Sequence, residues 1–542
     1  MAPSDTPATP ATRTLNVEPT VVQDDVQPTD VSTWNAIIRY RKSIGYVVIT
    51  TVSPLMFGFD NIIVGVVTGL PFFQMTYGQS IGEAYILPAL WLGLWNAFVQ
   101  LGIMLGASLN SSLIEKYGRR VGFSTGGVIG TAAVAAIYAS DRVASLNGRR
   151  GIFLLGKTIL GIALGVLLST SQTYVSEVSP TRLRGPLLGT YNFFMSIGQL
   201  IAITIIFTRF AIFNPSSYQV PFAAQWAFSG FAVIIGFVVP ESPAYLVRMG
   251  RIQEAAIAWG RLHSGPLADA EFASLEASVV RESAMSREEV DKSASIWQCF
   301  RGSNARRTRI IVWANLLQQL LGVTLISNGT YFLQLAGMSA QLSLTITQIG
   351  IACNLVAFAL SWYSINALGR RFIMLWSTGI VGVLWLSIGI AGCFQSQSTA
   401  LWYIGIGLMV LSFALSSGVG AAWPVVSAET SSMRLRSQSQ TVAWIANAFF
   451  SWLFNFFVPY LFNTDEANLG GKIGFIFAGL CTFGFLIIFF EIPEMKGLSY
   501  IEIDYMFEQN LPTRKFKTHC QSRNLSQADI KMEETIELSH KE

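Results

Sequence analysis

Two charged loops of this chain recur at a fixed spacing. Glu177, Arg182 and Arg184 each have a counterpart of the same type 252 positions later, at Glu429, Arg434 and Arg436 (177 against 429, for example). The triplet at Gly118 to Arg120 recurs 251 positions later at Gly369 to Arg371. Each of these loops lies beside long apolar segments. The repeat therefore predicts two homologous halves, each crossing a membrane several times.

Composition supports membrane insertion. The chain has 542 residues, of which 51% are hydrophobic and only 13% are charged, whereas a soluble domain carries roughly 25% charged residues. The 37 Phe and 14 Trp residues suit lipid-facing and interfacial positions. The five cysteines are scattered singly and predict neither a disulfide nor a metal site.

The apolar segments can be counted against the thickness of a bilayer. A helix needs about 20 apolar residues to cross it. On this criterion we expect an all-α protein with twelve transmembrane helices, at 44–70, 88–114, 121–141, 151–176, 187–209, 222–240, 309–335, 345–366, 372–393, 401–428, 438–462 and 473–492. The motif Gly161-x-x-x-Gly165 in the fourth segment predicts close helix packing.

These segments divide the chain into five regions. The expected regions are a disordered tail (1–36), an N-terminal six-helix half (37–240), a helical linker (241–308), a C-terminal six-helix half (309–494) and a second tail (495–542). The first tail has no apolar core that would make it a signal peptide. Lys and Arg gather in the loops on the side of the linker, so we expect both tails and the linker in the cytosol.

The inner loops carry acidic and basic residues at the helix ends. A bare marking of topology would explain them. Because an arginine can hold a carboxylate with two hydrogen bonds, the alternative is that pairs such as Glu177 with Arg184 and Glu429 with Arg436 gate the inner face. The expected gating network comprises Glu115, Arg119, Arg120, Glu177, Arg184, Glu241, Arg370, Arg371, Glu429 and Arg436.

Six short motifs, in order, resemble those of the sugar porter family of the major facilitator superfamily. They are Gly-Arg-Arg after the second and the eighth segment, Glu177-x-x-Pro-x-x-x-Arg-Gly, Pro240-Glu-Ser-Pro, Gln318-Gln-x-x-Gly322 and Pro493-Glu-Met-Lys-Gly. The resemblance implies two pseudo-symmetric six-helix halves, alternating access to a small-molecule sugar, and no enzymatic activity. The C-terminal end, from Pro493 to Lys517, resembles the fungal maltose and α-glucoside permease branch.

One acidic and one basic residue fall inside the segments. Asp60 is the only carboxylate near the middle of a span, and Lys157 is the matching cation. Such residues are costly in a bilayer and tend to face a cavity. They predict either a structural ion pair or a proton-coupling site, since burial favours the neutral form of a carboxyl group and a nearby ammonium favours the charged form. Proton symporters of the family resemble this chain at Asp60.

Sugar recognition favours amide side chains, because hydroxyl groups both donate and accept hydrogen bonds. The resemblance places five residues in the sugar site: Gln199, Gln318, Gln319, Asn354 and Trp444. Four more lie inside spans and predict either ligand contacts or hydrogen bonds between helices: Asn192, Thr324, Asn328 and Asn447.

The sequence thus favours a monomeric, multi-pass carrier in the plasma membrane that moves a mono- or disaccharide with protons. It predicts no cofactor, no metal and no nucleic-acid partner; the proton gradient is the expected driving force. Two alternatives stay open. A carrier of a quinate-like acid or another metabolite would want a cation in its cavity, and only Lys157 is available. A sugar sensor would usually signal through a long cytosolic tail.

Overall fold

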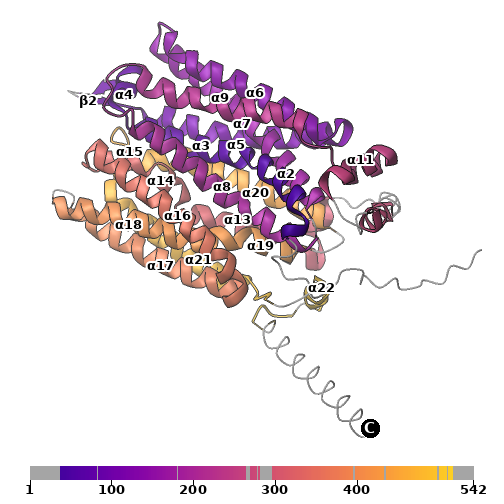
Figure 1. The fold of residues 1–542 in the computed structure, drawn as a ribbon. Coiled ribbons are helices and arrows are strands. Elements are labelled where there is room, and N and C mark those ends of the chain that lie inside the picture. The colour runs from indigo at the N-terminus through magenta and orange to yellow at the C-terminus, as the bar shows by residue number, and fades with distance from the viewer. Residues whose placement is uncertain are drawn as a thin grey trace, which may run out of the picture.

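The computed structural model describes residues 37–81, 84–179, 181–263, 269–277, 279–280, 296–394, 397–431, 435–496, 500–509, 511–514 and 516. Nearly all of them are helical, and the helices form two bundles that lie side by side (Figure 1). The N-terminal half forms one bundle and the C-terminal half the other. The predicted all-α membrane fold with two halves is confirmed.

The N-terminal bundle is built from long, nearly antiparallel helices. In order they are α2 (Arg41–Thr50), α3 (Val52–Val67), α5 (Ala89–Tyr117), α6 (Arg119–Ala139), α7 (Leu146–Val178), α8 (Thr181–Phe207) and α9 (Ser216–Val238). Shorter elements connect them: α4 (Pro71–Tyr77), the antiparallel hairpin of β1 (Gln79–Ile81) and β2 (Ala84–Ile86), and η1 (Ser140–Arg142).

The C-terminal bundle follows after the linker elements α10 (Pro243–Arg248), α11 (Ile252–Leu262) and η2 (Ile296–Phe300). Its helices are α13 (Gly302–Leu320), α14 (Val323–Ser327), α15 (Gly329–Leu335), α16 (Ala340–Leu368), α17 (Arg370–Ala391), α18 (Ser398–Ser417), α19 (Val419–Thr430), α20 (Arg436–Phe462) and α21 (Ile473–Glu491). The elements η3 (Gly392–Phe394), η4 (Gly470–Lys472) and α22 (Tyr500–Glu508) complete it.

The seventh expected span, 309–335, is not one continuous helix. Eleven helices of the described residues are long and apolar enough to cross a membrane, and the remaining crossing is broken into α13, α14 and α15. The first break falls at Gly322, whose φ of 87° lies in the left-handed region that favours glycine. The second falls at Asn328. Broken helices of this kind often line the binding sites of transporters, because they expose backbone and polar groups at membrane depth.

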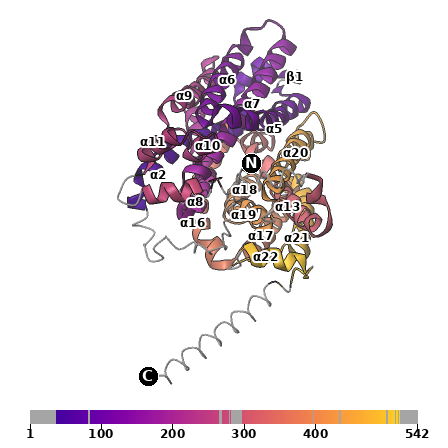
Figure 2. The same ribbon diagram turned by 90° about the vertical axis from the view of Figure 1, so that its right-hand side faces the viewer.

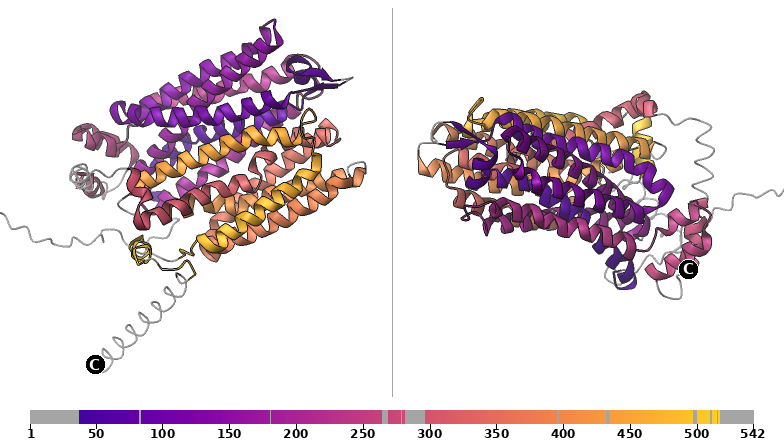
Figure 3. Two further views of the ribbon diagram at one scale, coloured as in Figure 1. Left: turned by 180° about the vertical axis from the view of Figure 1, so that it is seen from behind. Right: turned by 90° about the horizontal axis from the view of Figure 1, so that it is seen from above.

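The two bundles meet along matching helices. The helix α5 packs against α20, and α8 packs against α16. When α2 and α3 are counted as one crossing, the second and fifth crossings of each half thus contact the fifth and second of the other (Figures 2 and 3). The helix α3 also touches α14 and α15. Figure 1 places α11 and α22 at one end of the bundles, and α4 with β2 at the opposite end. We call these ends the inner and the outer side.

Glycines allow α5 and α7 to approach each other closely. A Cβ atom added at Gly106 would lie 2.1 Å from the carbonyl oxygen of Ile162, and one at Gly165 would lie 2.2 Å from that of Ile103. The same holds for Gly161 against Val99, at 2.4 Å. Backbones at this distance have no room for any side chain, which confirms the close packing predicted from Gly161-x-x-x-Gly165.

This contact predicts a stability difference between two matched variants. Gly106→Ala forces the two helices apart and should destabilise the protein by about 1–3 kcal/mol, the usual cost of overpacking. Gly230→Ala is the control, because a Cβ there meets nothing within 4 Å. Thermal midpoints of the detergent-purified proteins should fall for Gly106→Ala only; equal midpoints would contradict the packing described.

Candidate functional site

A cavity lies between the two bundles, and its wall carries every interior polar residue that the sequence singled out. The nine predicted ligand contacts are Asn192, Gln199, Gln318, Gln319, Thr324, Asn328, Asn354, Trp444 and Asn447, and all of them line this cavity together with Asp60 and Lys157. They come from both halves. Their common location brings the predicted sugar site and the predicted ion pair into one compartment, while their roles stay predictions.

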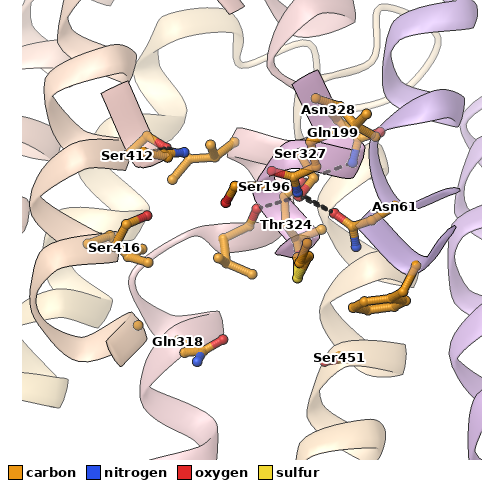
Figure 4. A pocket seen from close by; sticks show the side chains of 18 of the residues that line it. Asn61, Ser196, Gln199, Gln318, Thr324, Ser327, Asn328, Ser412, Ser416 and Ser451 are labelled. Carbon is orange, nitrogen blue, oxygen red and sulfur yellow. Dashed lines mark hydrogen bonds between the residues drawn. The ribbon is translucent and has the colours of Figure 1, made fainter. Parts of the chain in front are cut away.

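The broken seventh crossing supplies much of the polar surface. Gln318 and Gln319 end α13 just before the break, and Thr324, Ser327 and Asn328 follow it in and beside α14. A continuous helix would turn these side chains to different faces over its full length. After the break at Gly322, Thr324, Ser327 and Asn328 lie close together at the cavity, and Gln318 lies apart from them (Figure 4).

The ion pair joins α3 to α7. Lys157 Nζ lies 2.5 Å from Asp60 Oδ1, and the two side chains are only 1% and 2% exposed. Among the described residues of the cavity wall, no others are charged. A charge taken out of water is stable only beside a partner, and removing one member of a buried pair typically costs about 3–5 kcal/mol. Any process that separates this pair must therefore neutralise at least one of its members.

The cavity amides fall into two groups. The first group is already engaged: Gln319 donates from Nε2 to Ser451 Oγ (2.9 Å) and accepts at Oε1 from Thr324 Oγ1 (2.9 Å), while Asn354 Nδ2 donates to Ser412 Oγ (2.8 Å). These side chains are held in fixed orientations. They shape the cavity and keep only part of their hydrogen-bonding capacity for a ligand.

The second group is open to a ligand. Three residues line the cavity with amide side chains that make no hydrogen bond to any other residue that the structure describes: Gln318, Asn192 and Asn447. Polar groups of this kind must find partners in water or in a bound molecule. Figure 4 shows Gln318 apart from the side chains of Asn61, Thr324 and Ser327.

Two tryptophans form an aromatic part of the wall. Trp423 and Trp444 meet edge to face, with ring centroids 6.3 Å apart; both line the cavity, and Trp444 is 48% exposed. The exposed indole offers a flat apolar face. The structure places Trp423 in the same wall.

The sequence analysis missed several polar residues of the cavity. Asn61 and Asn96 lie in α3 and α5, and the serines concerned are Ser196, Ser327, Ser412 and Ser451. The two asparagines could have been found, because an amide inside a span is as costly as those that were chosen. The serines gave no signal, since a helical serine commonly satisfies itself on the preceding turn, as Ser327 does on Val323.

The two halves are fastened together on the outer side. Asn463 Nδ2 donates to the carbonyl of Leu87 (2.8 Å), and Asp465 Oδ2 accepts from the backbone N–H of Ala89 (2.9 Å). Closer to the cavity, Asn96 Nδ2 donates to Asn328 Oδ1 (3.3 Å). These contacts close the outer end in the conformation described.

The inner charge networks lie within the halves and not between them. Arg119 pairs with Glu177 at 2.7 Å in the N-terminal half, and Arg370 pairs with Glu429 at 2.9 Å in the C-terminal half. No ion pair among the described residues links one half to the other. As far as the described side chains go, each of these ion pairs holds helices of one half together, and the gating role stays a prediction.

Some expected partners differ. The described partners of Glu177 are Arg119 and Arg248, whereas the side chains of Arg184 and Arg436 lie outside the described residues. Glu115 is exposed, and it forms no ion pair with any residue placed in the structure. Arg119 instead contacts Glu177 at the end of α7, and the Arg120 side chain donates to the carbonyls of Gly236 and Phe237 in α9.

Two carboxylates outside the spans repeat the same motif. Glu241 accepts from the backbone N–H groups of Arg119 and Arg120 at 2.8 and 3.3 Å, and Glu494 accepts from that of Arg370 at 3.1 Å. Each carboxylate caps the exposed N–H groups at the start of a helix. The glycines before those helices, Gly118 and Gly369, have φ of 92° and 96°. The sequence included Glu241 in the network and missed Glu494.

Outer closure depends on a close approach at Gly65. A Cβ atom added there would lie 2.4 Å from the carbonyl oxygen of Ser327 in the other half. Gly65→Ala should therefore disfavour the outer-closed state by about 2 kcal/mol, a shift of roughly 30-fold in population. Gly45→Ala is the control, since a Cβ there meets nothing.

A thiol reporter at a cavity position measures this shift. In Ala448→Cys, with the native cysteines replaced, an impermeant maleimide applied from outside should label the Gly65→Ala protein several-fold faster than the Gly45→Ala protein. Equal labelling rates would mean that Gly65 does not limit outer closure.

Comparisons with known proteins agree with this architecture. A model of the family "Sugar (and other) transporter" matches residues 46–507. The chain is 31% identical over 505 residues to "MFS transporter fmqE" of Aspergillus fumigatus, covering 90% of this chain and 92% of that protein. It is 29% identical over 491 residues to "General alpha-glucoside permease" of Saccharomyces cerevisiae, covering 89% and 78%.

Solved structures of similar fold include two of the xylose transporter XylE. The proton:xylose symporter with a bound sugar analogue superposes with a TM-score of 0.66 at 20% identity, covering 87% of this chain and all of that one. An inward-open form from E. coli gives 0.67 at 18% identity, with 86% and 99% covered. These likenesses concern the fold.

Proposed function

The chain belongs to the Sugar (and other) transporter family of multi-pass membrane carriers, and from this premise we propose that it moves a neutral sugar of the α-glucoside type together with a proton. It is a transporter and not an enzyme. The observation that carries the proposal is the buried Asp60–Lys157 pair in the wall of an amide-rich cavity between two halves.

The chemistry of the wall supports a neutral ligand with many hydroxyl groups. Apart from Asp60 and Lys157, which form an ion pair with each other, the polar and aromatic groups of the described wall are amides, hydroxyl groups and aromatic rings. Open amides such as Gln318 can donate to one hydroxyl and accept from another. An anionic ligand would need a free cation, and Lys157 is held by Asp60. The permease from Saccharomyces cerevisiae supports an α-glucoside as the sugar.

Proton coupling follows from the electrostatics of the pair. With the pair intact, α3 is held against α7 by two charges that cannot separate cheaply in a low-dielectric interior. A proton on Asp60 removes the attraction and leaves Lys157 free to find water in the cavity. Binding of the proton and of the sugar would then both favour the movement that alternates access.

The charge networks of the inner side suit rigid halves that rock. Arg119 with Glu177, and Arg370 with Glu429, tie helix ends together inside one half. Arg120 and Arg371 donate to backbone carbonyls at the ends of α9 and α21. We propose that these contacts keep each bundle intact during the cycle. We further propose a monomer in the plasma membrane, with both termini and the linker in the cytosol.

Uptake in a transporter-deficient yeast tests the substrate. We expect radiolabelled maltose to accumulate in cells expressing the chain, and a protonophore to abolish accumulation. Glucose and quinate serve as comparison substrates. Uptake of quinate but not of either sugar would contradict the proposal and favour a metabolite carrier. The name of the Aspergillus fumigatus relative, an MFS transporter, specifies no sugar and is compatible with that alternative. If none of the three compounds is taken up, the proposal is contradicted as well.

Charge removal tests the coupling. Asp60→Asn leaves Lys157 buried and unpaired, so the double variant Asp60→Asn/Lys157→Gln is the better probe, because it removes both charges. We expect the double variant to exchange internal for external maltose at a rate within about tenfold of the wild type. It should lose accumulation against a gradient. Retained accumulation would place the coupling proton elsewhere.

A further inference from the structure

Asn61 follows Asp60 in α3 and occupies the centre of a three-way junction. Its Oδ1 accepts from Gln199 Nε2 at 3.4 Å and from Ser327 Oγ at 3.3 Å. Gln199 belongs to the N-terminal half and Ser327 to the C-terminal half. Figure 4 shows the three side chains converging at the cavity, with the hydrogen bonds drawn.

The two hydrogen bonds determine what the neighbours can offer to a ligand. A glutamine amide that donates from Nε2 to Asn61 is held in one orientation, which leaves Oε1 as a free acceptor. The Ser327 hydroxyl has one proton and two acceptors near it, Asn61 Oδ1 at 3.3 Å and the carbonyl of Val323 at 3.1 Å, so its oxygen can accept from a ligand while its proton stays within the protein. The junction therefore presents two acceptors, one from each half, to the hydroxyl protons of a ligand.

The contacts of Asn61 with Gln199 and with Ser327 differ in whether they persist when the two halves move. A Cβ atom at Gly58 would lie 1.9 Å from the carbonyl of Met195, and one at Gly198 would lie 2.1 Å from that of Leu55. These interlocked backbones make α3 and α8 a single unit, so the contact of Asn61 with Gln199 survives any movement of the halves. The contact with Ser327 crosses the halves and exists only while the outer side is closed.

We propose that Asn61 is a positioning residue, which orients Gln199 as an acceptor throughout the cycle and contacts Ser327, a second acceptor, when the outer side closes. This inference rests on the proposed sugar transport. Sugar binding is thereby coupled to the position of α3, the helix that carries Asp60. A ligand held by both acceptors stabilises the same closed state that brings α3 against α14. Asn61 itself acts through Gln199 and Ser327.

A double-mutant cycle on maltose uptake tests the proposal. Asn61→Ala should raise the KM for maltose about tenfold and change the maximal rate per surface transporter less than about threefold, because it loosens the ligand's acceptor and leaves the ion pair intact. In a Gln199→Ala background the same change should raise KM by less than about twofold, since the group that Asn61 orients is gone.

Asn96→Ala is the matched control. Asn96 is another cavity asparagine that contacts the opposite half, through Asn328, and no hydrogen bond joins it to Gln199 among the described residues. Its effect on KM should be the same in both backgrounds. Ser327→Ala should raise KM on its own, because it removes the acceptor that the C-terminal half contributes.

The outcomes distinguish a failure of the proposed role of Asn61 from a failure of the proposed sugar transport. If Asn61→Ala multiplies KM equally with and without Gln199, it is a structural residue and the proposal is overturned. If Asn61→Ala does not reach the cell surface, Asn61→Ser replaces it in the cycle, because its shorter side chain keeps a polar group that cannot reach both donors. Failure of the wild type to take up maltose would contradict the proposed function first.

Discussion

The rest of the structure depends on one buried ion pair. Asp60 and Lys157 lie at the wall of a central cavity, almost without exposure, and the rest of the wall that the structure describes carries no charge. Two charges in such a place stabilise each other, and neither is stable alone. The pair therefore acts as a constraint on α3 that a proton can release. A carrier that must not let protons leak benefits from a constraint that is strong until it is neutralised.

The architecture around the pair separates rigid parts from moving ones. Within each half, glycine contacts such as those between α5 and α7, and the arginine–glutamate pairs at the inner ends, hold helices at fixed distances. Between the halves, the described polar contacts lie on the outer side or at cavity level, as with Asn463 and Leu87 or Asn96 and Asn328. Rigid bundles joined by few polar contacts can rock about a central site.

Much of this could be predicted from the sequence, for physical reasons that differ from residue to residue. Long apolar segments and duplicated loops fix the number of crossings and the two halves. Interior amides and charges stand out against hydrocarbon, so their gathering at one cavity was expected. Asn61 and Asn96 are exceptions among them, since these interior amides stand out as much as the rest and were not predicted.

Other features depend on three-dimensional contacts that the sequence does not display. The break at Gly322 depends on a left-handed glycine inside an apolar run. The partner of Glu177 comes from a helix end 58 residues away, which loop proximity did not suggest. The engagement of Gln319 by Ser451, which separates it from the open Gln318, depends on the packing of α13 against α20.

The most direct test of proton coupling through Asp60 is the proton flux that accompanies sugar entry. Addition of maltose to de-energised yeast expressing the chain should make the lightly buffered medium more alkaline, with protons and sugar entering at similar initial rates. The double variant that removes Asp60 and Lys157 as charges should move sugar with no alkalinisation. Sugar entry without proton entry in the wild type would contradict the account.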